Sequence, residues 1–165
     1  MIIITSTENG ICGLYINAKE ELAEVKKYNY NLTRADVSLS KIKYQLNDYF
    51  NAKIRKFECK FDFLWGAGFP KKAWMKLEEI PYGEICSYKW LAIECGKEKV
   101  FRAIGSAVGK NPIPIILPCH RVFNNDGGID GFGYGVPMKV KLLKIDGVDL
   151  NINPTGISIS AKARL

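Results

Sequence analysis

Two short helical segments joined at one glycine constrain the fold of this chain more than any other feature of its sequence. Ser87 can cap the first segment, which runs to about Cys95, and Gly96 ends it. The second segment runs from about Glu98 to Gly109. Two short helices with a glycine between them are typical of a helix-turn-helix. Ordinary helical hairpins in protein cores have the same spacing, so both interpretations stay open at this point.

The second of these helices carries unusually small side chains. From Arg102 to Gly109 only Ile104 and Val108 are large and apolar. Gly105 and Gly109 each cost about 1 kcal/mol relative to alanine inside a helix. Such a helix lets another body approach its backbone closely. That body is either a second element of the chain or the walls of a DNA minor groove, which is about 6 Å wide.

The first half of the chain combines strand and helix patterns. Residues 2–5 and 11–16 have strand patterns and are separated by Glu8-Asn9-Gly10, a strong hairpin signal. Residues 19–28 have the pattern of a charged helix. After Ser38, which we expect to act as a cap, apolar residues recur at steps of three and four and predict another helix.

The Trp65-Gly66-Ala67-Gly68 run interrupts these patterns and predicts a boundary between two lobes. We expect an N-terminal α/β lobe at residues 1–65, a helix-turn-helix lobe at residues 69–150 and a tail at residues 151–165. A chain of 165 residues can bury a core without a disulfide or a metal ion.

Composition and charge exclude several classes of protein. With 47% hydrophobic and 25% charged residues, the chain is neither disordered nor collagen-like, and its apolar runs are too short to span a bilayer. The apolar start lacks the features of a secretory leader, so we expect a cytoplasmic protein with five reduced cysteines. One histidine excludes a multi-histidine metal site. The net charge of +7 suits a polyanionic partner, but equally a solubilising surface.

The only histidine of the chain, His120, lies between Cys119 and Arg121. A cysteine with an ordinary pKa of about 8.5 is only a few per cent thiolate at pH 7, and a neighbouring imidazole or cation raises that share. The pattern indicates a reactive thiol, although a buried cysteine beside a solvent-facing histidine is the simpler alternative. If the chain stays extended after Pro118, the two side chains point to opposite faces. Contact between them then needs a bridging water or a local turn.

The sequence around these residues resembles the O6-alkylguanine-DNA alkyltransferases. The resemblance covers about residues 66–147 and rests on four runs: Ile80-Pro81-Tyr82-Gly83-Glu84-Ile85-Cys86-Ser87-Tyr88-Lys89-Trp90-Leu91-Ala92, Arg102-Ala103-Ile104-Gly105, Asn111-Pro112 and Pro118-Cys119-His120-Arg121-Val122. It implies an RNase H-like α/β N-terminal lobe and a mainly helical, winged helix-turn-helix C-terminal lobe. It also implies DNA repair by direct reversal, with the damaged guanine flipped out of the duplex.

The resemblance implies a role for each catalytic residue. Cys119 accepts the alkyl group irreversibly, once per molecule. His120 takes the thiol proton through a water, and Asp146 orients the histidine. Tyr88 rotates the target phosphate and protonates the departing guanine, while Arg102 fills the vacated place in the base stack.

Further residues follow from the same resemblance. The implied DNA contacts are Arg102, Ala103, Gly105, Tyr88 and Arg121. The implied substrate pocket consists of Asn111, Pro114, Val122, Phe132, Gly133 and Tyr134, with the backbone carbonyls of Cys119 and Val122 facing the amino edge of guanine. The implied partner is double-stranded DNA containing O6-alkylguanine, bound through the minor groove with little sequence preference. A monomer without a metal ion, another cofactor or a membrane contact is expected.

Several positions depart from the pattern of the family, among them Pro70, which stands where glutamine is frequent. Asp146 stands where glutamate is usual and is one methylene shorter. Phe132 replaces a tyrosine, which keeps a ring but loses a hydroxyl, and Tyr134 stands among residues that are usually small.

Three other functions compete with alkyl transfer. A sensor that only binds alkylguanine lacks the cysteine that this chain has at position 119. A cysteine hydrolase needs a separately placed histidine, and this chain has one histidine in all. A transcriptional regulator reads bases in the major groove with side chains that residues 102–105 do not supply.

Overall fold

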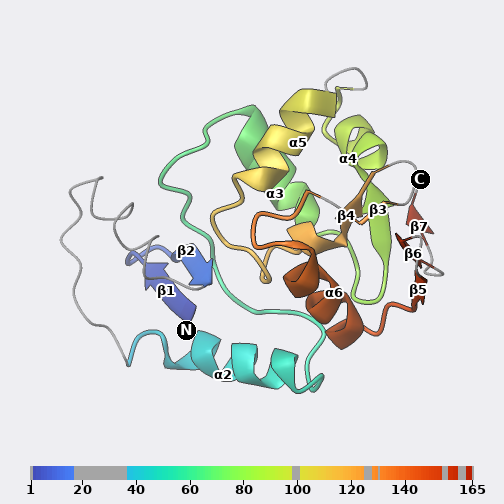
Figure 1. Cartoon of the computed structure of the whole chain (residues 1–165). Helices are drawn as coiled ribbons and strands as arrows, with labels where there is room; N and C mark the ends of the chain where they lie inside the picture. Colours follow the sequence, from blue (N-terminus) through green and yellow to red (C-terminus); the bar gives the residue numbers. More distant parts are fainter. Residues whose placement is uncertain are drawn as a thin grey trace. The chain divides into compact units, whose positions relative to one another are not determined.

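The computed structural model describes residues 2–16, 37–97, 101–124, 128–129, 131–153, 156–159 and 163–164 (Figure 1). The chain divides into two compact units, Met1–Leu64 and Trp65–Leu165. The helix expected at residues 19–28 lies outside the described residues. Within the described ranges, no helix has the length and apolar character needed to cross a membrane.

A β-hairpin forms the start of the first unit. Strands β1 (Ile2–Ser6) and β2 (Ile11–Ile16) pair antiparallel, with Ile2 opposite Ile16. Gly10 ends the turn because the chain passes very close to it: a Cβ atom there would lie 2.5 Å from the backbone oxygen of Lys60. The amide of Ile11 donates a hydrogen bond to that same oxygen, at 2.8 Å. The hairpin is therefore tied to a segment about fifty residues further along the chain.

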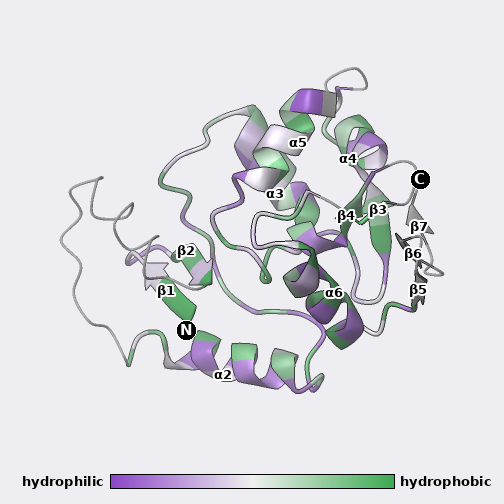
Figure 2. Cartoon of the chain, in the orientation of Figure 1, coloured by the Kyte–Doolittle hydropathy of each residue, from purple (hydrophilic) through white to green (hydrophobic). Residues whose placement is uncertain are grey.

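Helix α2 (Ser40–Phe50) packs through Ile42, Leu46 and Tyr49, which recur at steps of four and three. It accordingly shows both hydrophobic and hydrophilic faces in Figure 2. The expectation that Ser38 caps this helix is wrong. Residues 37–39 form a turn of their own, and the helix begins after Leu39 without a side-chain cap.

Three helices form the first part of the second unit: α3 (Phe69–Leu77), α4 (Tyr88–Glu94) and α5 (Phe101–Gly109). The predicted Ser87 cap is confirmed, since its hydroxyl accepts a hydrogen bond from the Trp90 amide at 3.0 Å. The indole of Trp74 on α3 donates to the Ala107 carbonyl on α5 at 2.7 Å. Helices α3, α4 and α5 therefore pack as one group (Figure 1).

A small parallel sheet connects this group to the rest of the unit. Strand β3 (Ile85–Ser87) lies between β4 (Val122–Phe123) and β7 (Ala163–Arg164). All three residues of β3 are buried. Since β3 continues directly into α4, and β4 directly follows a one-turn 3-10 helix at Cys119–Arg121, the sheet fixes the positions of both.

The chain ends with helix α6 (Val136–Ile145) and a β-hairpin of β5 (Leu150–Asn153) and β6 (Gly156–Ile159). Ile85, Phe123, Leu143 and Val148 form a buried cluster that joins the sheet to α6. The sheet and α6 thus bring the 3-10 turn and the C-terminal end of α6 together, which positions the site described next.

The Ser87 cap can be tested by its removal. Ser87→Ala should lower the free energy of unfolding by about 1 kcal/mol, because the Trp90 amide loses its partner. Urea unfolding can be followed by tryptophan fluorescence, since Trp65, Trp74 and Trp90 all belong to the second unit. Ser106→Ala, at an exposed position inside α5, is the matched control and should not destabilise the protein. Equal midpoints for Ser87→Ala and the wild type would contradict the cap.

Candidate active site

Cys119 and His120 lie in a tight turn rather than in an extended segment. The Cys119 amide donates to the Leu117 carbonyl at 2.8 Å, and the Arg121 amide donates to the Pro118 carbonyl at 2.9 Å. The three residues from Cys119 to Arg121 form one turn of 3-10 helix and are all buried. Of the two expected geometries, the local turn is the one the chain adopts.

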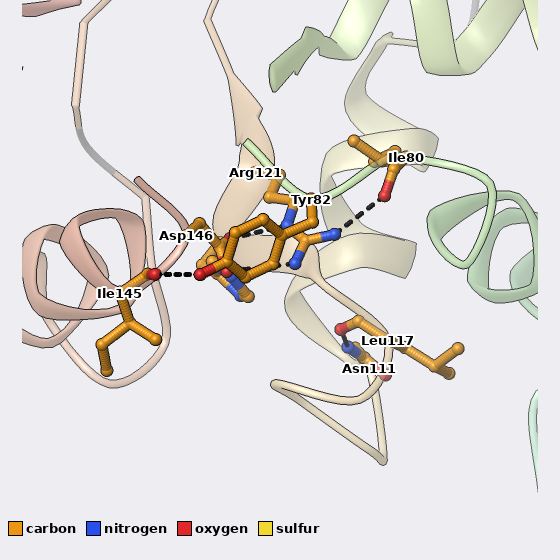
Figure 3. A network of polar contacts seen from close by, with 8 residues as sticks. Ile80, Tyr82, Asn111, Leu117, Arg121, Ile145 and Asp146 are labelled. Atoms are coloured by element: carbon orange, nitrogen blue, oxygen red, sulfur yellow. Dashed lines mark hydrogen bonds and ion pairs between the residues drawn. The ribbon is translucent and has the colours of Figure 1, made fainter. Parts of the chain in front are cut away.

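Asn111 closes the loop that precedes this turn. Its side-chain amide donates to the Leu117 carbonyl at 2.8 Å (Figure 3), and its side-chain oxygen accepts from the Ile113 amide at 3.0 Å. Inside the loop, Ile115 is buried and has a φ angle of 75°. A β-branched residue in this left-handed region carries strain of about 1–3 kcal/mol and needs firm surroundings to persist. The loop therefore holds the Cys119 turn as a fixed structure.

A buried carboxylate lies at the centre of the site. Asp146 Oδ2 is 2.9 Å from His120 Nε2 and accepts a hydrogen bond from Arg121 Nε at 2.6 Å. Its other oxygen, Oδ1, accepts from Arg121 Nη2 at 3.1 Å. The remaining nitrogen of the guanidinium, Nη1, donates to the Ile80 carbonyl at 2.8 Å (Figure 3). Despite its short side chain, Asp146 reaches the histidine directly.

The expectation that Arg121 contacts DNA is wrong. The residue is 5% exposed, and its guanidinium is fully engaged by Asp146 and Ile80. It faces the interior because the 3-10 turn directs it toward the end of α6 instead of toward the surface.

Tyr82 lies against the ion pair of Arg121 and Asp146. The sequence patterns had not indicated a role for this residue. Its hydroxyl donates to the Ile145 carbonyl, at the end of α6, and its ring lies 5.7 Å from the Arg121 guanidinium carbon (Figure 3). The loop between α3 and β3 is thereby bound to the residue that precedes the carboxylate.

Lys139 is a second residue that the sequence reasoning missed. It is 1% exposed, donates to the Val122 carbonyl at 2.7 Å and lies 4.1 Å from the centre of the Phe123 ring. The available signal was its position, because Lys139 and Asp146 fall on the same stripe of α6 as Leu142 and Leu143. A carbonyl has two lone pairs, so Lys139 occupies one of the two that Val122 offers.

The ionisation states follow from burial and from these contacts. Burial raises the pKa of the Cys119 thiol, against smaller lowering effects of Asn111 and the Lys139 charge. Burial lowers the pKa of His120, against the raising effect of Asp146. Burial alone would raise the pKa of Asp146, but hydrogen bonds from His120 and Arg121 outweigh it and lower that pKa to about 2. At neutral pH the site holds a thiol, a neutral imidazole and a carboxylate.

The second ring nitrogen of His120 makes this arrangement chemically useful. Nδ1 is buried and has no hydrogen-bond partner among the described residues, whereas Nε2 is held by Asp146. A neutral imidazole bound to a carboxylate in this way can accept a proton at Nδ1. The site is therefore suited to remove the proton from a nearby acid, and the adjacent thiol is such an acid.

The residues expected to meet DNA lie on α4 and α5. Arg102 and Ala103 are exposed at the start of α5, and Tyr88 is half-buried at the start of α4. A Cβ atom placed on Gly105 or Gly109 would meet nothing within 4 Å. Close packing within the described part of the chain therefore does not account for these glycines.

The remaining pocket residues occupy two places. Pro114 is buried in the loop before the nucleophile and pairs with Leu117. Phe132 and Tyr134 pack edge to face, with ring centres 5.8 Å apart, and Gly133 between them is exposed. Their loop approaches α4, since a Cβ atom on Gly131 would lie 3.9 Å from the Tyr88 hydroxyl. Across the described ranges, no cluster of three or more histidine, cysteine or acidic residues could hold a metal ion.

Two sequence profiles of one family match the chain. The profile described as the ribonuclease-like domain of 6-O-methylguanine DNA methyltransferase matches residues 1–63. The profile described as the DNA binding domain of the same protein matches residues 68–148. The methylated-DNA–protein-cysteine methyltransferase of Methanosarcina barkeri is 44% identical over 102 residues, which are 62% of this chain and 64% of that protein's length.

Solved structures resemble the chain over most of its length. The O6-methylguanine methyltransferase of Mycobacterium tuberculosis superposes with a TM-score of 0.72 and 29% identity, covering 88% of this chain and 91% of that one. A structure of Mycobacterium tuberculosis OGT in complex with DNA also has a TM-score of 0.72 and 29% identity, covering 88% and 85%.

The buried carboxylate makes a prediction about stability and pH. The pKa of Asp146 is about 2 in the folded protein and 3.8 ordinarily, so its ionised form stabilises the fold above pH 3.8. This stabilisation of about 2 kcal/mol should be lost as the pH falls through the pKa of Asp146 in the folded protein. Asp146→Asn lacks this stabilisation and leaves the Arg121 charge without its carboxylate partner. The variant should therefore have a lower free energy of unfolding than the wild type at about pH 5. The difference between the two proteins should narrow toward about pH 2.

Urea unfolding followed by tryptophan fluorescence measures this difference at each pH. The exposed Asp149→Asn is the control and should give a nearly constant offset from the wild type. If the difference in the free energy of unfolding between Asp146→Asn and the wild type stays constant over this pH range, the fold does not hold the carboxylate in its ionised form.

Proposed function

The chain belongs to the 6-O-methylguanine DNA methyltransferase family, with a ribonuclease-like N-terminal domain and a DNA-binding C-terminal domain, and on that premise we propose that it repairs alkylated guanine in DNA by direct reversal. The alkyl group on guanine O6 moves to Cys119, once per molecule. The observation that carries this proposal is the buried Cys119–His120–Asp146 arrangement, in which Nδ1 of the imidazole has no partner in the described part of the chain.

The proposed reaction is a single displacement. The Cys119 proton passes through a bridging water to Nδ1 of His120, and the resulting imidazolium stays bound to Asp146. The sulfur attacks the alkyl carbon while the bond from that carbon to O6 breaks, and the electron pair stays with guanine. The Tyr88 hydroxyl gives its proton to the departing base. The thioether that forms is stable, so the protein is not regenerated.

The base must leave the duplex before it reaches a thiol that is 7% exposed. We place α5 in the minor groove, because Gly105 and Gly109 make this helix slim and a Cβ atom at either glycine would meet nothing within 4 Å in the described structure. Arg102, exposed at the leading end, fills the space that the flipped base leaves. Tyr88 turns the phosphate. The small side chains of α5 offer little to read bases, so phosphate contacts supply most of the affinity and sequence preference is weak.

For the two domains we propose the finer forms that the resemblance implies. We propose an RNase H-like lobe at residues 1–65 and a winged helix-turn-helix lobe at residues 69–150, acting as a monomer on intracellular DNA. The profile matches at residues 1–63 and 68–148 support this division. The tail at residues 151–165 contributes β7 to the sheet that carries β3, which supports a structural part for its last residues.

The pocket residues serve to hold the flipped base. Asn111 fixes the loop before the nucleophile, and Pro114 lies within that loop. Phe132 offers a ring for stacking beside Tyr134, and the exposed Gly133 adds no side chain to this loop. The second lone pair of the Val122 carbonyl is proposed to accept from the guanine amino group, beside the Lys139 ammonium.

A sensor that binds alkylguanine without accepting the alkyl group is the nearest alternative function. It has no use for a cysteine at position 119 or for a base beside it. The buried relay of His120 and Asp146 next to Cys119 favours transfer over sensing.

The nucleophile can be tested by intact mass. After incubation with duplex DNA containing O6-methylguanine, the wild type should gain one methyl group, located on Cys119 by peptide mapping. Cys119→Ser should fold and bind the same duplex but gain nothing, because a hydroxyl is far less acidic than a thiol. Cys59→Ser, at a half-buried position in the other unit, is the control and should react like the wild type. A methyl group found on any other cysteine would contradict the assignment.

Arg102 can be tested by comparing two substrates. Arg102→Ala should slow single-turnover repair of duplex DNA at least tenfold more than it slows reaction with free O6-alkylguanine base, because the free base needs no extrusion. Lys110→Ala removes an exposed charge from the end of α5 and is the control for lost electrostatic affinity. It should weaken binding at moderate salt without changing the rate at saturating DNA. Equal losses on both substrates in Arg102→Ala would assign this residue to chemistry or folding instead.

A further inference from the structure

We propose that Arg121 is a positioning residue of the alkyl-transfer site: it holds the Asp146 carboxylate in the orientation that binds His120 through Nε2 and leaves Nδ1 available to accept the thiol proton. This inference rests on the proposed function, and it assigns Arg121 a part in the reaction although the residue touches neither substrate nor thiol.

Arg121 and His120 share the Asp146 carboxylate. Oδ2 of Asp146 accepts from both Arg121 Nε and His120 Nε2, and Oδ1 accepts from Arg121 Nη2. Two parallel bonds from one planar guanidinium leave a carboxylate no freedom to rotate. The guanidinium is itself anchored, because Nη1 donates to the Ile80 carbonyl. The direction in which Oδ2 faces the imidazole is therefore set by Arg121.

The charge of Asp146 lies in an unfavourable place. It is the C-cap residue of α6, where the helix dipole disfavours a negative charge. It is also 1% exposed, so water does not solvate it. The Arg121 guanidinium is its ion-pair partner, and the His120 ring contacts the same carboxylate. Without that partner the carboxylate would be buried at the unfavourable end of a helix.

Charges of both signs surround the His120 imidazole. The 3-10 turn contributes Cys119 and Arg121, and α6 and its cap contribute Lys139 and Asp146. Asp146 favours the protonated ring, whereas Arg121 and Lys139 oppose it. An imidazolium in the resting state could not accept the thiol proton. Burial is the main cause of the lowered pKa of His120, and Arg121 adds to it by opposing the pull of the carboxylate that it orients.

The shielding of the pair fits this role. The Tyr82 ring lies against the guanidinium, and its hydroxyl holds the Ile145 carbonyl next to the carboxylate. Because solvent is kept away from the ion pair, its fixed geometry has a strong electrostatic effect on the neighbouring ring.

The single histidine permits a test that does not depend on activity. In full-length protein labelled with ¹⁵N-histidine, every histidine signal belongs to His120. The wild type should show the neutral Nε2–H tautomer at neutral pH. In Arg121→Gln the titration of the ring should move to higher pH and the preference for that tautomer should weaken. Lys144→Gln, which removes an exposed positive charge from the last turn of α6, is the control and should titrate like the wild type.

The rate of transfer supplies the second readout. With free O6-alkylguanine base across pH 5–9, Arg121→Gln should react at least tenfold more slowly, and the acid limb of its profile should lie at higher pH. In an Asp146→Asn background the same substitution should cost little further rate, because Arg121 acts through that carboxylate. Arg121→Lys keeps the positive charge but cannot make the two parallel hydrogen bonds of the guanidinium, and it should react at an intermediate rate. This variant replaces Arg121→Gln in the test if Arg121→Gln does not fold.

The outcomes separate this inference from the proposed function. A wild type that transfers no alkyl group would refute the function, while the histidine spectra would still decide the role of Arg121. A folded Arg121→Gln with unchanged tautomer and titration would overturn the inference. A wild-type rate of transfer in Arg121→Lys would show that the two parallel hydrogen bonds of the guanidinium are not needed, which would also overturn the inference. An equal loss of rate with and without the Asp146 carboxylate would show that Arg121 acts by another route.

Discussion

The ion pair between Arg121 and Asp146 is the interaction on which the site depends. It joins three segments that are distant in sequence: the loop after α3 through Ile80, the 3-10 turn through Arg121 and the end of α6 through Asp146. Taking both charges out of water is costly, and the pair offsets that cost only through its two parallel hydrogen bonds. Its contribution is therefore mainly one of specificity, since other arrangements of these segments leave a buried charge unpaired.

Local signals in the sequence predicted the parts of this structure that local physics decides. The Ser87 cap follows from one hydroxyl and one nearby amide. Ser38 failed as a cap because residues 37–39 form a separate turn and Leu39 takes the cap position, a shift of one residue that helix periodicity does not specify. Arg121 was misplaced for a similar reason. A basic residue beside a DNA-binding motif suggests a phosphate contact, whereas its real partner lies 25 residues along the chain.

Lys139 shows what a closer analysis of periodicity could have found. A lysine and an aspartate seven residues apart, on a helix stripe that also holds Leu142 and Leu143, are charged groups at buried positions. Such groups need partners. Their identity, the Val122 carbonyl for Lys139 and two side chains for Asp146, depends on where the 3-10 turn meets α6. No pattern within one segment can specify that meeting point.

The burial of Cys119 has a consequence for how long each molecule stays usable. A protein that reacts once is wasted if its sulfur meets peroxide or a disulfide first, and both attack exposed thiolates most readily. Here Cys119 is 7% exposed, and burial raises the pKa of its thiol, so it rests as a shielded thiol. The base that activates it is equally enclosed, since His120 is fully buried. Under the proposed function, the enclosure that requires an extruded guanine also protects the unreacted thiol from oxidation.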